Sequence, residues 1–197
     1  MTCGMTLELG LEGLRRVFKT SSEGVNVVDE VHLDVAVLPV LPDSAMREIV
    51  REMLREGGWS ASADGSLEKT FGGAVATLSP DGARVTVRVA SAATVSAQAT
   101  VVVDAAEKDS GAERAAEQQA RERVKELALR ERERLAAANV KTLTAQEPAV
   151  RGEVQRALNR TYRKALEERA RQMGEVESID ERGAQGGSYE VTVVVKA

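Results

Sequence analysis

The chain has few of the residue types on which most catalytic and metal sites depend. Its 197 residues include one cysteine, Cys3, and one histidine, His32. A single cysteine excludes an internal disulfide, and a single histidine excludes a histidine-rich metal site. Aromatic residues make up only 3% of the chain, so few rings are present on which single-stranded nucleic acid could stack. The core must therefore be mainly aliphatic.

Long apolar runs and a strong net charge are also missing. No apolar run approaches the roughly 18 residues that a membrane-spanning helix needs, and no basic N-terminal region followed by an apolar stretch suggests a secretion signal. The formal net charge of −4, from 27 basic and 31 acidic residues, is too small to attract nucleic acid or a membrane by itself. We therefore expect a cytoplasmic protein that does not bind membranes.

The first half of the chain predicts strands with one well-defined helix. Apolar residues at helical spacing favour a short helix over residues 5–19, although two glycines weaken it. Alternating valines and polar residues predict a strand over 31–37, and an apolar stripe over 46–54 predicts a helix. From 59 to 104, turn sequences separate β-prone segments, which indicates consecutive antiparallel strands.

The second half is dominated by charge. About half of residues 107–138 are charged, and their narrow apolar stripe is interrupted by Glu131, whereas residues 148–173 have a broader apolar face. We expect these two helices to pair as an antiparallel helical hairpin over 106–174.

The elements together predict a single α+β domain over residues 1–197. In it an antiparallel sheet from residues 25–105 carries packed helices, the helical hairpin at 106–174 is an insertion, and a β-hairpin at 175–197 ends the chain.

No catalytic, cofactor or metal constellation stands out. His32 shares a strand face with Asp34, and Asp29 and Glu30 lie close in sequence, but adjacent acids and one exposed imidazole are usually solvated. The glycine pairs lack the Lys-Ser/Thr of a phosphate loop and do not open a helix. We expect no enzyme, no cofactor and no metal, unless these four residues converge in a closed pocket.

Two surfaces remain as candidates. The first is a basic ridge on the second long helix, formed by Arg156, Arg160, Arg163 and Lys164. It is either a solvated face balanced by nearby glutamates, which we favour, or a contact for phosphate groups or nucleic acid. The second is a protein interface on the first long helix, in the manner of a coiled coil, with Arg121, Val124, Leu127 and Leu135. It predicts a homo-oligomer or a stable hetero-complex.

The C-terminal quarter resembles a known family. Three segments carry the resemblance: LNRTYRKALE at 158–167, MGEV at 173–176 and GSYEVTV at 187–193. They are similar to the end of a small plastid and bacterial family of unknown function, in which a Tyr-bearing helix leads through a glycine into a terminal hairpin. The charged helix at 107–138 departs from that compact pattern.

Related small domains occur beside AAA+ ATPases in bacterial multi-component systems. The resemblance therefore implies a non-enzymatic accessory or adaptor role, and it offers no catalytic residue to carry over.

Overall fold

The computed structural model describes residues 6–7, 14–104, 110–183 and 189–196. In these ranges the elements, in chain order, are β1 (Thr6–Leu7), β2 (Leu14–Asp34), α1 (Asp43–Glu56), β3 (Ser60–Ala61), β4 (Leu67–Phe71), β5 (Ala74–Leu78), β6 (Arg84–Asp104), α2 (Ser110–Met173), β7 (Glu175–Gly183) and β8 (Tyr189–Lys196). Neither of the two described helices has a stretch apolar and long enough to cross a membrane.

The strands form two sheets. Six strands follow the order β1-β2-β6-β5-β4-β3, and β7 pairs with β8 in a second sheet. The neighbours β3–β4, β4–β5 and β5–β6 are antiparallel, and β5 pairs with β6 only between Val85 and Arg88. The predicted α+β class and the C-terminal hairpin are confirmed.

Residues 30–89 and 141–197 form one compact unit, which we call the sheet-and-helix unit. Its core is built from large side chains: Met46, Ile49, Met53 and Leu54 of α1 pack with strand residues such as Leu67 and Leu78 and with Val150 and Ala157 of α2. Trp59 is 3% exposed and meets the ring of Phe71 edge-on, with ring centres 6.1 Å apart. The apolar stripe that predicted α1 thus faces this core.

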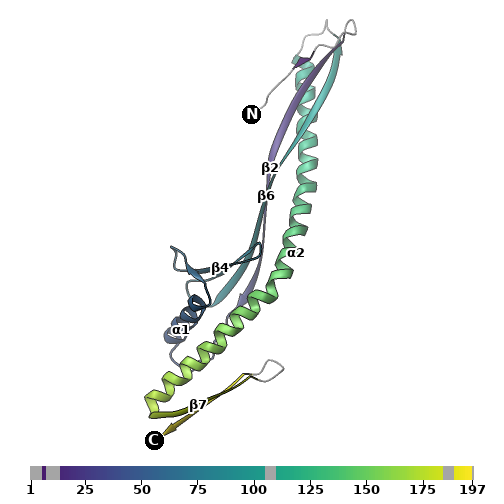
Figure 1. Cartoon of the computed structure of the whole chain (residues 1–197). Coiled ribbons are helices and arrows are strands. Elements are labelled where there is room, and N and C mark those ends of the chain that lie inside the picture. Colours follow the sequence, from purple (N-terminus) through teal and green to yellow (C-terminus); the bar gives the residue numbers. More distant parts are fainter. Residues whose placement is uncertain (1–5, 8–13, 105–109, 184–188, 197) are drawn as a thin grey trace. The chain divides into compact units, whose positions relative to one another are not determined.

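Residues 1–29 and 90–140 form the second unit, the ribbon unit. Here β2 and β6 run beside the first part of α2 (Figure 1). Val25, Ala128 and Leu135 form its buried cluster, with Val27, Ala93 and Val95 packed against them. Further along the helix Ala116, Ala120 and Val124 are also buried. Small side chains thus dominate this core.

The predicted helical hairpin is wrong, because residues 110–173 form one continuous helix. Leu135, Asn139, Leu143 and Val150 are all buried, and their spacings of 4, 4 and 7 keep them on one helical stripe. Residues 139–145, which would have to form the turn of the hairpin, are therefore part of the helix. Pro148 lies inside the helix on its exposed side, where packing of its neighbours offsets the lost backbone hydrogen bond.

The helix predicted over residues 5–19 is also wrong where the structure describes it. Thr6–Leu7 is a strand that pairs with Val17 and Arg16, and Leu14–Lys19 belongs to β2. Pairing between strands overrides the helical spacing of the leucines, which the two glycines had already weakened. Residues 1–5 and 8–13 lie outside the described part of the chain.

Asn139 fixes the position of α2 on the ribbon. It is 1% exposed. Its side-chain nitrogen donates to a carboxylate oxygen of Asp29 at 2.9 Å, and its oxygen accepts from the Ser91 hydroxyl at 2.6 Å. Because buried polar groups are costly without partners, a shift of the helix along β2 and β6 would break these bonds. Asn139 therefore specifies the register of the ribbon unit.

We predict that Asn139→Ala lowers the free energy of unfolding by about 1–3 kcal/mol, because it leaves buried polar groups unpaired. Urea denaturation followed by circular dichroism measures the loss. The matched control is Asn159→Ala in the same helix, which gives the same gain in helix propensity. The half-buried Asn159 accepts a hydrogen bond from the exposed Gln155 at 3.0 Å. Equal losses in the two variants would contradict the role assigned to Asn139.

Candidate functional site

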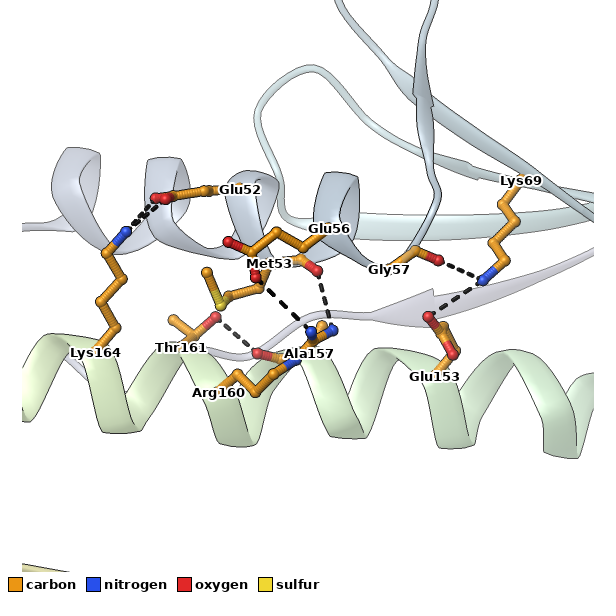
Figure 2. Close-up of polar contacts among 10 residues, drawn as sticks. All are labelled: Glu52, Met53, Glu56, Gly57, Lys69, Glu153, Ala157, Arg160, Thr161 and Lys164. Carbon is orange, nitrogen blue, oxygen red and sulfur yellow. Dashed lines mark hydrogen bonds and ion pairs between the residues drawn. The ribbon is translucent and has the colours of Figure 1, made fainter.

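The basic ridge predicted from the sequence lies on α2 in the sheet-and-helix unit, and each of its cations has an acidic partner. Arg156 donates to Glu153 at 2.6 Å and Arg163 to Glu167 at 3.0 Å. Lys164 reaches across to Glu52 of α1 at 2.6 Å. Figure 2 shows the contact between Lys164 and Glu52, which joins the two helices. The pairs of Arg156 and Arg163 lie within α2.

Arg160 binds the C-terminal turn of α1. It donates to the Met53 carbonyl at 3.1 Å and lies 3.8 Å from the Glu56 carboxylate (Figure 2). The Met53 carbonyl also accepts from the Gly57 amide. It lies at the negative end of the α1 dipole, where a guanidinium is stabilising. Arg160 therefore caps α1 from a neighbouring helix.

The most enclosed ionic contact of this surface is centred on Glu153. Its side chain is 13% exposed, and it accepts from Lys69 of β4 at 3.2 Å as well as from Arg156. Lys69 also donates to the Gly57 carbonyl at 2.6 Å (Figure 2). A Cβ at Gly57 would lie 2.6 Å from the Glu153 carboxylate, so a side chain there would displace the end of Glu153 from its present position.

These partners change the titration of Glu153. The hydrogen bond from Arg156, and then the contacts with Lys69, lower the pKa of the Glu153 carboxyl below its ordinary value of 4.5. The carboxylate form is therefore favoured in the folded protein.

An open groove of about 610 Å³ runs beside the ridge. Its lining combines Met53 with cations and acids of α2, including Arg160, Glu168 and Arg171. The lining has four cations and two acids, and each cation pairs with a glutamate: Arg163 and Arg171 with Glu167, Lys164 with Glu52 and Arg160 with Glu56. No cysteine, histidine or hydroxyl is among the lining residues. The groove therefore offers no thiol, imidazole or hydroxyl nucleophile.

The four residues that could have formed a catalytic cluster do not converge. Nδ1 of His32 lies 3.1 Å from the Thr86 hydroxyl and Nε2 lies 3.4 Å from Glu30, on an exposed strand face. Asp34 pairs with Arg84 on that face, whereas Asp29 bonds to the buried Asn139. Among the described residues no group of three metal-ligating side chains occurs. Cys3 lies outside the described ranges.

The residues predicted as a protein interface separate into two pairs. Val124 and Leu135 are 2% and 7% exposed and belong to the interior of the ribbon unit. Leu127 is 39% exposed, and Arg121 stays at the surface, where it pairs with Glu117 of the same helix. Only Arg121 and Leu127 are therefore accessible to another molecule.

A larger accessible surface lies on β6 and was not predicted as a site. Every second residue of β6 from 90 to 102 is exposed, and none carries a charge: Ala90, Ala92, Thr94, Ser96, Gln98, Thr100 and Val102. We call this the uncharged face. Charged residues make up 29% of the chain, so the run is unusual. This face could have been identified from the sequence, because side chains alternate between the two faces of a strand and the uncharged residues occupy every second position.

Comparison with known proteins gives one match. Residues 14–197 match the model of a family described as FtsH ternary system domain X5. No curated protein and no solved structure matches the chain. The family is associated with AAA+ protease systems. This agrees with the resemblance of the C-terminal quarter to a family whose relatives occur beside AAA+ ATPases. The match extends that relationship to residues 14–197.

We predict that Glu153→Gln lowers the free energy of unfolding by about 1.5–3 kcal/mol at neutral pH, because hydrogen bonds to a charged group are lost. The pKa of Glu153 is lower in the folded state, so its contribution is complete above the unfolded value and disappears as the pH falls through the folded value. The difference between wild type and variant should therefore shrink below pH 4.5.

Urea denaturation at neutral pH and in acid measures this difference. The control is Glu147→Gln, which removes an exposed pair with Arg151 on the same helix and should cost about 0.5 kcal/mol or less. A deficit of Glu153→Gln that persists unchanged in acid would contradict the assignment.

Proposed function

We propose, from the premise that this chain belongs to the FtsH ternary system domain X5 family, that it is a non-enzymatic accessory module. In this proposal it docks on a protein component of an AAA+ protease system. The uncharged face of β6 carries the proposal. The cores of protein interfaces are depleted in charge, whereas solvated strand faces are usually polar and charged.

The rest of the ribbon unit supports this location. On β2 the neighbouring residues Gly24, Asn26 and Val28 are exposed and uncharged as well, and Val28 is 47% exposed. The opposite face of the ribbon packs on α2 through Val25 and Ala93. The exposed face is thus supported from behind by a helix.

The remaining surfaces fit a binding module better than an enzyme. The open groove lacks a thiol, imidazole or hydroxyl nucleophile, His32 lies on an open strand face, and the ridge cations are paired with glutamates of their own unit. Phosphate binding through that ridge would first require breaking these pairs. The partner is accordingly proposed to be a protein with an apolar or uncharged contact surface.

We predict that Thr94→Lys/Gln98→Lys weakens the association at least about tenfold, because two charges would be buried without partners. The protein is purified from its native cells without denaturation, and bound components are identified by mass spectrometry, then titrated against both forms. The matched control, Leu127→Lys/Leu129→Lys, adds the same charge on the exposed side of α2 and should bind as wild type does.

The control also tests the alternative interface. Loss of binding only in the helix variant would transfer the contact to the surface around Arg121 and Leu127. Full binding by both variants would exclude the ribbon unit as the docking element.

A further inference from the structure

The C-terminal hairpin is a sheet without a core. β7 and β8 pair only with each other, and none of their described side chains is buried. Ile179, Val191 and Val193 are half-covered, and Val194 is 42% exposed. An isolated two-stranded hairpin is marginally stable in water, and at least three strands with an apolar face are needed for independent stability. The hairpin therefore lacks the additional strands that an independently stable sheet needs.

Its two outer edges differ in how they are protected. β7 is acidic, with Glu177 and Asp180 exposed, and its register is interrupted by a bulge between Val176 and Ser178. Charges and bulges are the devices that prevent edge strands from pairing. β8 has neither over residues 191–195, where its sequence is Val-Thr-Val-Val-Val. The edge of β8 is therefore the one open to another strand.

We propose that a second copy of this chain pairs with β8 in antiparallel orientation, with Val193 at the two-fold axis. The positions of the two charged residues of β8 favour antiparallel over parallel pairing. The strand has one acid, Glu190, and one base, Lys196, three positions on either side of Val193. Antiparallel pairing about Val193 places Glu190 of each copy opposite Lys196 of the other. Parallel pairing in register would instead place like charges together, which is unfavourable.

The product is a four-stranded sheet in the order β7-β8-β8-β7. In the hairpin Ile179 is already paired with Val193, so the pairing brings two such apolar pairs together on one face. The sheet then exceeds the three-strand threshold, and the open edges of both copies disappear. A two-fold contact of this kind closes on itself and does not propagate into fibres.

Two charge-reversed forms of the full chain test this proposal. Glu190→Lys makes β8 entirely basic at these positions, and Lys196→Glu makes it entirely acidic. Each variant alone should dimerise at least about tenfold more weakly than wild type, because two like-charged cross-strand pairs replace two attractive ones. An equimolar mixture of the two should restore dimers, since each acid then faces a base. Sedimentation velocity over a concentration series measures all three samples.

The mixture separates this contact from damage to the hairpin. Glu190 is paired with Arg182 inside the hairpin and Lys196 with Glu175, and those internal pairs are the same before and after mixing. Only a contact between copies can respond to mixing. Glu177→Lys, a matched reversal on the protected strand β7, should dimerise as wild type does.

Three outcomes would overturn the proposal: a wild-type chain that stays monomeric over the concentration series, dimers that ignore both reversals, or variants that do not recover on mixing. None of them bears on the uncharged face of β6, whose test reads binding of another protein.

Discussion

The structure depends on one stripe of buried side chains along α2, which serves the cores of both units. Ala128, Asn139, Val150 and Thr161 are all buried, and each lies eleven residues after the one before. An eleven-residue repeat has about 3.67 residues per turn, close to the natural 3.6 of a straight helix. The line therefore continues from Ala128 to Thr161 without a break. A heptad repeat would require a supercoil to do the same.

The two units use that line differently. In the sheet-and-helix unit it meets the large apolar residues of α1 and the strands, and ionic contacts such as Lys164 with Glu52 fix the crossing. In the ribbon unit it meets the small residues of β2 and β6, and Asn139 supplies the positional specificity that alanines cannot. Alanine packs equally well at several helix positions, whereas a buried amide is satisfied at only one.

The sequence predicted those elements whose periodicity is local. The stripe of α1, the antiparallel strands over 59–104 and the terminal hairpin are all marked by patterns within a few residues, and their predictions are confirmed. The prediction of a helical hairpin is wrong because Asn139 and Leu143, which would have to lie in its turn, continue the helical spacing from Leu135 to Val150. The partners of Arg160 and Lys164 could not be predicted, since Glu52 and Glu56 lie about a hundred residues earlier in the chain. The uncharged face could have been found, because it needs only the strand alternation and the absence of charge.

The small side chains of the ribbon core have a consequence for local opening. Burying an alanine removes far less apolar area from water than burying the methionine, leucine and tryptophan side chains of the other unit. Backbone amides of the ribbon unit should therefore exchange with deuterium through openings of lower free energy than those around α1 and β4. Opening there would expose two strands and half of a helix while α1 remains packed. The size of the side chains that pack on α2 thus determines that the ribbon unit opens before the sheet-and-helix unit.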